Sequence, residues 1–108
     1  MAVRSVSPNG VTFFSRAEVE ARFETGGLLL DAGSYKVDAG RRTAPGDVEL
    51  HDDVVDIMHV VEGEATVVAG TATHQLGEGD VLVIPQGVPH QFVDVSEPFL
   101  YFVAKVEA

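Results

Sequence analysis

The chain has 108 residues, of which 45% are hydrophobic and 22% charged, and its 17 acidic against 7 basic side chains give a formal net charge of −10. This length predicts a single domain, residues 1–108, because it suffices for one hydrophobic core but not for two. So acidic a chain excludes nucleic acid and membrane surfaces as partners, since both bind through Lys and Arg. The sequence contains no cysteine, so any metal must be held by His, Asp or Glu.

The apolar residues predict the fold class. Nineteen residues are Val, and they occur in short runs separated by Gly and Pro. Because β-branched side chains fit a pleated sheet better than a helix, this composition predicts an all-β protein. No apolar stretch has the length of a signal peptide core or a membrane span, so we expect a soluble cytoplasmic protein.

The first predicted element is a helix of about two turns over residues 15–23, within an N-terminal part that covers residues 1–45. Ser15 followed by Glu18 forms a capping box, in which each side chain bonds a free amide of the first turn. We expect the chain to be a homodimer, with this helix and the pair Phe13 and Phe14 as candidate contacts.

A strand over residues 28–37 and a turn-rich loop over residues 38–46 follow the helix. The loop carries Arg41 and Arg42, which we interpret as a solvated pair outside any site. Residues 46–106 form the predicted barrel core, with strands at 48–51, 56–62, 65–69, 71–76, 80–85, 90–93 and 99–106. Short strands without crossover helices indicate antiparallel pairing into a sandwich or barrel.

Two stretches carry the candidate site. Glu49 and His51 lie on one face of their strand, because side chains alternate with period two, and Asp56 begins the next strand. His90 leads a strand that returns after the turn containing Pro85 and Gly87.

These stretches resemble the two motifs of the cupin superfamily, small jelly-roll β-barrels. GDVLVIPQGVPHQFVD, from Gly79 to Asp94, matches Gly-x5-Pro-x-Gly-x2-His-x3-Asn except that Asp94 replaces Asn. The run from Gly46 to Gly63 is similar to the first motif and keeps its second His as His51. It has Glu49 where the first His is expected and Asp56 where Glu is expected.

The resemblance implies a divalent metal inside the barrel, held by Glu49, His51, Asp56 and His90. The alternatives are a hydrogen-bonded barrel histidine at 51 and 90 without metal, and a solvated carboxylate at 49. A register with His51 and Asp53 as the first two ligands leaves a spacing that is too short for the family.

Two imidazoles and two carboxylates suit Mn, Fe, Co, Ni or Zn, and we prefer Mn or Fe. Without a cation, Glu49 and Asp56 would confront each other in the barrel interior. Asp is about 1.5 Å shorter than Glu, so Asp56 is expected to bind directly or through water. Four such ligands would make the divalent centre neutral, which disfavours oxalate-type chemistry.

Alternation along the strands predicts the cavity wall. Met58 and Val60 share the face of Asp56, and Phe92 and Asp94 share that of His90. His59 is expected on the opposite, outer face, and His74 in a supporting or packing role.

The sequence thus predicts a metal-binding cupin with a cavity for a small organic molecule. One hypothesis is a metal-dependent enzyme of the oxygenase, isomerase, lyase or decarboxylase type; the other is a non-catalytic binding or sensing protein with a structural metal or none. Serine hydrolase, phosphate-loop and dinucleotide motifs are missing, and no catalytic residue is assigned.

Overall fold

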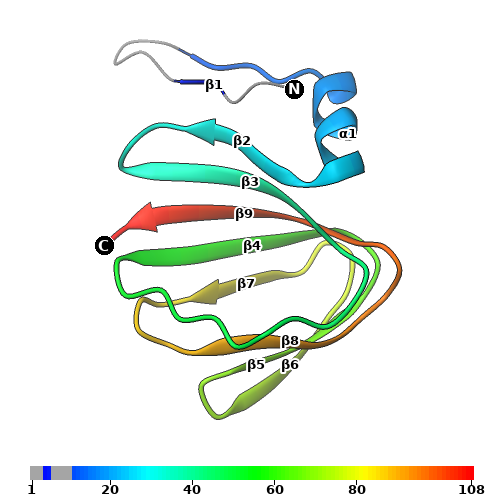
Figure 1. Cartoon of the computed structure of the whole chain (residues 1–108), viewed down its shortest axis with the longest axis vertical. Coiled ribbons are helices and arrows are strands. Elements are labelled where there is room, and N and C mark those ends of the chain that lie inside the picture. The colour runs from blue at the N-terminus through cyan, green and yellow to red at the C-terminus, as the bar shows by residue number, and fades with distance from the viewer. Residues whose placement is uncertain (1–3, 6–10) are drawn as a thin grey trace.

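The computed structural model describes residues 4–5 and 11–108, which fold into two β-sheets and one helix (Figure 1). This confirms the predicted all-β, jelly-roll-like class with one short helix. The elements in chain order are β1 (Arg4–Ser5), α1 (Arg16–Thr25), β2 (Gly27–Asp31), β3 (Tyr35–Arg42), β4 (Val54–Glu62), β5 (Ala65–Ala69), β6 (Ala72–Leu76), β7 (Val81–Ile84), β8 (His90–Val95) and β9 (Phe99–Glu107).

The larger sheet has the strand order β1-β2-β3-β9-β4-β7, and the smaller sheet has the order β6-β5-β8. All pairs are antiparallel except β1 with β2, as expected for a chain without crossover helices. Ladder hydrogen bonds run within each sheet, so the two sheets do not close into one continuous barrel. The last strand, β9, lies between β3 and β4, so the C-terminal strand is hydrogen-bonded to strands from the first half of the chain.

The main core lies between the two sheets, because alternate side chains of their strands point inward. On β9 these side chains are Phe99, Tyr101 and Val103, all of which are buried. They pack against Val67 of β5 and Phe92 of β8. The ring centroids of Phe92 and Tyr101 are 5.4 Å apart, which ties the smaller sheet to the larger one.

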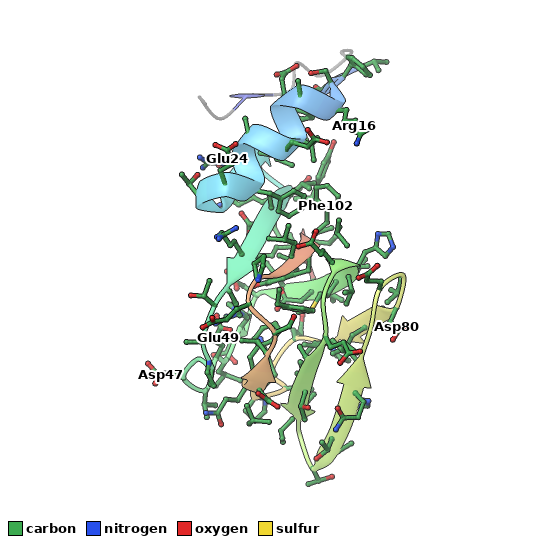
Figure 2. All side chains as sticks on the ribbon, turned by 90° about the vertical axis from the view of Figure 1, so that its right-hand side faces the viewer. Arg16, Glu24, Asp47, Glu49, Asp80 and Phe102 are labelled. Atoms are coloured by element: carbon green, nitrogen blue, oxygen red, sulfur yellow. The ribbon has the colours of Figure 1, made fainter. Side chains whose placement is uncertain are left out.

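Helix α1 covers the opposite face of the larger sheet. The helix lies on the side of the sheet where Phe102 of β9 points (Figure 2). Its buried Phe23 packs on Phe102, with ring centroids 5.0 Å apart. The predicted capping box is confirmed: Ser15 Oγ accepts from the Glu18 amide at 3.1 Å, and Glu18 Oε1 accepts from the Ser15 amide at 3.3 Å. The helix ends at Thr25 and is capped by Gly26, whose φ of 75° favours glycine.

The region between the helix and residue 54 differs from the sequence prediction. The strand expected over 28–37 is two strands, because Asp31 Oδ1 accepts from the Gly33 amide at 3.0 Å and turns the chain. The first part of the loop expected over 38–46 belongs to strand β3 instead, which pairs with β9 as far as Arg42. The strand expected over 48–51 is reduced to one bridge, between Glu49 and His90.

Among the described residues, no helix has the length and apolar character needed to span a membrane.

Candidate metal centre and cavity

Hydrogen bonds that join the loop between β3 and β4 to strand β8 and the turn before it hold the candidate site together. Glu49 and His90 exchange backbone bonds of 2.7 and 2.9 Å, and the Gly87 amide donates to the His51 carbonyl at 2.8 Å. Gly46 adds a bond of 3.1 Å from its amide to the Phe92 carbonyl. These contacts bring His51 beside His90, with their ring centroids 5.3 Å apart.

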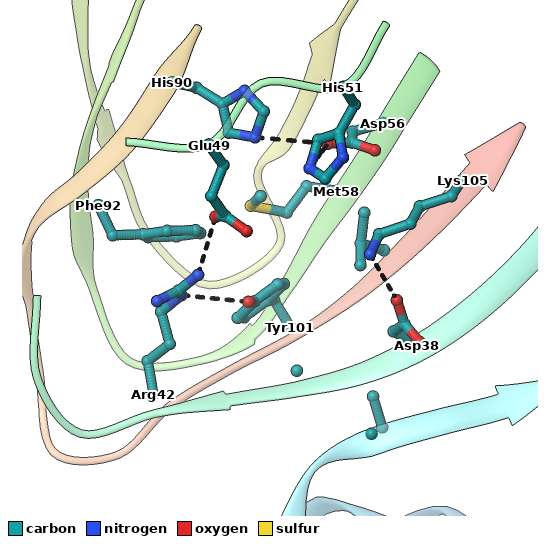
Figure 3. A pocket seen from close by; sticks show the side chains of 14 residues that line it. Asp38, Arg42, Glu49, His51, Asp56, Met58, His90, Phe92, Tyr101 and Lys105 are labelled. Carbon is teal, nitrogen blue, oxygen red and sulfur yellow. Dashed lines mark hydrogen bonds and ion pairs between the residues drawn. The ribbon is translucent and has the colours of Figure 1, made fainter. Parts of the chain in front are cut away.

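Asp56 supplies the third side chain from β4, where it pairs with Ile84 of β7 and Lys105 of β9. Its Oδ2 lies 3.5 Å from His90 Nε2 and 3.7 Å from His51 Nε2 (Figure 3). One ligand atom from each of these three residues lies within 4.8 Å of the other two. Two histidines and one carboxylate therefore converge on one point inside the sandwich.

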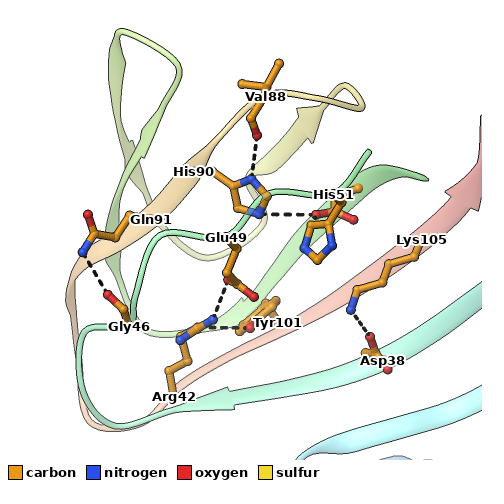
Figure 4. Close-up of polar contacts among 11 residues, drawn as sticks. Asp38, Arg42, Gly46, Glu49, His51, Val88, His90, Gln91, Tyr101 and Lys105 are labelled. Atoms are coloured by element: carbon orange, nitrogen blue, oxygen red, sulfur yellow. Dashed lines mark hydrogen bonds and ion pairs between the residues drawn. The ribbon is translucent and has the colours of Figure 1, made fainter. Parts of the chain in front are cut away.

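The tautomer of His90 follows from its backbone contact. Its Nδ1 lies 3.0 Å from the Val88 carbonyl oxygen (Figure 4). A carbonyl oxygen only accepts, so Nδ1 carries a proton and donates to Val88, which leaves Nε2 as the ring nitrogen that faces Asp56. Metal-binding histidines are commonly oriented by such a bond from the other ring nitrogen.

Asp56 is 4% exposed, and its Oδ1 is the buried side-chain oxygen that lacks a hydrogen-bond partner among the described residues. Burial raises the pKa of Asp56, while His51, His90 and Lys105 act in the opposite direction and Glu49 raises the pKa further. An orphaned, desolvated carboxyl facing two imidazole nitrogens needs either a proton or a cation.

The spacing of the three donors fits a metal. Ligand atoms bound at 2.0–2.2 Å in tetrahedral or octahedral geometry lie about 3 to 3.6 Å apart. The two Nε2 to Oδ2 distances, 3.5 and 3.7 Å, are close to this range. The chemistry and the placement of His51, Asp56 and His90 thus suit a first-row divalent cation.

Glu49, the fourth predicted ligand, is outside this group. Its Oε2 accepts from Arg42 Nη2 at 3.0 Å, and the pair is part-buried (Figures 3 and 4). The structure therefore directs this carboxylate to a guanidinium rather than to the two histidines.

Arg42, which the sequence interpretation left outside the site, lies in the cavity wall. Its Nε donates to the Tyr101 hydroxyl at 3.3 Å, and its guanidinium carbon lies 4.1 Å from the centroid of the Phe92 ring. Alternation along β3 could have indicated this position, because Arg42 and Gly40 lie on the same face of the strand. On that face the missing Cβ of Gly40 leaves room for the Tyr101 ring. The glycine was interpreted as part of a turn.

The cavity beside the three residues has a volume of about 270 Å³. Of the predicted wall residues, Met58 and Phe92 line it, and Val60 lies deeper in the core. Asp94 is exposed and lies outside the cavity, which differs from the prediction because a bulge in the pairing of β5 with β8 breaks the alternation after Phe92.

Other polar side chains of the cavity form their own pairs. Lys105 Nζ lies 3.2 Å from Asp38 Oδ2.

The other two histidines lie outside the cavity. His59 is exposed on the outer face of β4, as the alternation indicates, and His74 is half-buried on β6. Neither of these two histidines belongs to the converging group.

Two facing sheets with a two-histidine, one-carboxylate group in the cavity between them define a jelly-roll-like protein with a candidate metal centre. Residues 34–104, more than half of the sequence, match the cupin domain family (Cupin_2), and the chain belongs to this family. An uncharacterized protein of Streptomyces coelicolor is 32% identical over 68 residues, which cover 63% of this chain and 61% of that protein. The match thus spans less than two thirds of that relative.

Solved structures show the same fold. The Cnp3 cupin domain of Schizosaccharomyces pombe has a TM-score of 0.71 at 13% identity, covering 77% of this chain and 60% of that one. KdgF from a Halomonas species has a TM-score of 0.69 at 20% identity, covering 77% and 79%. A cupin-2 domain protein of Shewanella frigidimarina has a TM-score of 0.66 at 18% identity, covering 76% and 79%.

Proposed function

We propose that this cupin binds one first-row divalent metal through His51, Asp56 and His90 and uses it to bind and activate a small organic substrate in the adjoining cavity. The observation that carries the proposal is the buried Asp56, whose Oδ1 has no hydrogen-bond partner among the described residues and whose Oδ2 faces two imidazole nitrogens. Mn or Fe is the preferred metal, as expected from the sequence.

Three protein ligands leave coordination positions for a substrate. A bound metal with two histidines and one carboxylate supplies Lewis-acid or oxygen-binding chemistry. With Glu49 paired to Arg42, the centre would carry a charge of +1 rather than the neutral charge expected from four ligands. This charge favours an anionic substrate, including the oxalate type that the sequence interpretation disfavoured.

The residues around the centre have distinct roles in this proposal. The Val88 carbonyl holds His90 in the tautomer that presents Nε2. Met58, Phe92 and Val103 form an apolar wall of the cavity, which limits the access of water to the bound substrate. Arg42 and Lys105 bring positive charge to the same space.

Elemental analysis of the purified protein tests the metal centre. We expect about one equivalent of a first-row metal in the parent and almost none in the double variant His51→Ala, His90→Ala. The matched control is the double variant His59→Ala, His74→Ala, which removes the other two histidines and should keep the metal. Equal trace amounts in all three proteins would exclude the proposal.

A second candidate function is a metal-free binding or sensing protein. The raised pKa of Asp56 favours it, because a protonated carboxyl could donate to one of the facing Nε2 atoms and complete the cavity without a cation. A parent protein that takes up no metal after dialysis against Mn²⁺, Fe²⁺ or Zn²⁺ would support this second function. The cytoplasmic location expected from the sequence stays a prediction.

A further inference from the structure

A polar cluster that the proposed metal centre does not use lies elsewhere in the cavity wall. Arg42 donates to Glu49 and to Tyr101, and the face of its guanidinium lies on Phe92 (Figure 3). The Arg42 side chain is 21% exposed. Contacts on both the edge and the face of the guanidinium fix its direction, so a positive charge is held in place at the cavity.

The chemistry of this cluster suits a carboxylate. A guanidinium presents donors in a planar fork that matches the two oxygens of a carboxylate. The Tyr101 hydroxyl accepts from Arg42, which leaves its own proton for another acceptor. Burial raises the pKa of Tyr101, so the phenol remains a donor at neutral pH.

Glu49 occupies this arrangement through a single bond to Arg42, and its side chain is 39% exposed. It also lies close enough to the metal group for its charge to raise the pKa of Asp56. Glu49, at the position of the first ligand in the cupin motif, therefore lies between the Arg42 guanidinium and the candidate metal centre. A ligand carboxylate that displaced it from Arg42 would leave Glu49 beside the metal.

We propose that Arg42 and Tyr101 form a carboxylate-binding subsite, that Glu49 occupies this subsite when no ligand is present, and that the cavity takes small monocarboxylates. The limit to one carboxylate rests on the proposed function, because it counts the charge of the divalent cation; the subsite itself does not.

The charges of the cavity support one carboxylate rather than two. The charged side chains that line it are Asp38, Arg42, Glu49, Asp56 and Lys105. With neutral imidazoles they sum to −1, and a divalent cation changes the sum to +1, which one carboxylate neutralises. The volume of about 270 Å³ is below the usual range for drug-sized ligands, so the acid must be small.

Propanoate titrated into metal-free protein in EDTA, followed by amide chemical shifts, tests the subsite without the metal. We expect Arg42→Gln to weaken propanoate binding roughly 10- to 100-fold, the loss typical of a charged hydrogen-bonded pair. Arg41→Gln is the matched control, since it removes the same charge at the exposed neighbouring position and should leave binding unchanged. Propanamide, the neutral analogue, should bind to none of these proteins.

Glu49→Gln provides the second arm. Removing the competing charge should tighten propanoate binding by about 10-fold while the Arg42 contact is kept. Equal binding by Arg42→Gln and Arg41→Gln, or absent or weaker binding by Glu49→Gln, would overturn the subsite. If Arg42→Gln does not fold, Arg42→Lys keeps the charge without the fork and should also bind propanoate more weakly.

The two proposals fail separately. A parent that takes up no metal but binds propanoate through Arg42 would remove the proposed function and keep the subsite. A parent that holds metal but binds propanoate independently of Arg42 would do the reverse.

Discussion

At the scale of single residues, Asp56 decides what the cavity can hold. It is buried on β4 between two histidines, and burial outweighs the neighbouring positive charges, so its pKa is raised in the folded chain. A buried carboxyl of this kind is unfavourable as a free anion, and a metal or a proton removes the penalty. The same residue thus links metal binding to stability and to pH.

The linkage gives a testable pH dependence. A carboxyl whose pKa is higher in the folded than in the unfolded chain contributes stability that is present below the unfolded pKa and is lost as pH rises through the folded pKa. In EDTA we therefore expect Asp56→Asn to lack this loss and to be at least as stable as the parent at neutral pH. Urea denaturation at a series of pH values measures the free energy of unfolding of both proteins. Asp52→Asn, an exposed change of equal charge, should retain the parental profile.

Gly40 is a second decisive residue. A Cβ at this position would overlap the ring of Tyr101, which lies directly opposite Gly40 on the neighbouring strand β9. We expect Gly40→Ala to destabilise the fold by about 1–3 kcal/mol through this overlap and to weaken propanoate binding by moving the phenol. Gly77→Ala, where the added carbon meets an ordinary contact of 3.8 Å, should change neither quantity. Unchanged denaturation midpoints for both variants would contradict this prediction.

At the scale of elements, helix α1 depends on its first turn, because it is only 10 residues long. Ser15 and Glu18 satisfy one amide each through the capping box. We expect Ser15→Ala to lower the free energy of unfolding by about 1 kcal/mol. Ser34→Ala, at an exposed turn, should stay within about 0.5 kcal/mol of the parent. Chemical denaturation followed by far-ultraviolet circular dichroism compares them, and equal midpoints would exclude a stabilising cap.

At the scale of the whole molecule, the centre joins segments that are far apart along the chain. His51 lies in the loop between β3 and β4, Asp56 lies on β4, and His90 begins β8 of the other sheet. A metal that binds only the folded chain should therefore stabilise both sheets together.

Free metal at 100 times its dissociation constant should add roughly 2.7 kcal/mol to stability. For a domain of this size, that corresponds to a rise in melting temperature of roughly 10 °C or more, which EDTA should reverse. Differential scanning calorimetry measures the shift. The variant His51→Ala, His90→Ala should show none, and an equal shift in that variant would place the metal elsewhere.

The homodimer also belongs to this scale and stays a prediction. Ile57, Val81 and Val83 are 40%, 59% and 54% exposed, and the register of β4 with β7 places Ile57 opposite Val83. This outer face is a further candidate contact, beside the N-terminal residues suggested by the sequence. Sedimentation equilibrium should find a dimer, and the double variant Val81→Lys, Val83→Lys should be monomeric if this face is the contact. A monomeric parent would exclude the dimer.

Local patterns in the sequence were sufficient for the strands from residue 54 onward and for the helix cap. Period-two alternation and turn residues such as Pro85 and Gly87 act over a few residues, so they are visible without a fold. The resemblance to the cupin motifs supplied the ligand candidates by position, and the structure brings three of them, His51, Asp56 and His90, together.

Only the tertiary structure decided the partner of Glu49, the place of Arg42 and the exposure of Asp94. Each depends on which strands lie side by side: β3 beside β9 brings Arg42 to Tyr101, and a bulge between β5 and β8 turns Asp94 outward. Sheet neighbours are joined by hydrogen bonds between residues distant in the chain, so the direction of a charge in this cavity is a property of the strand pairing and not of the local sequence.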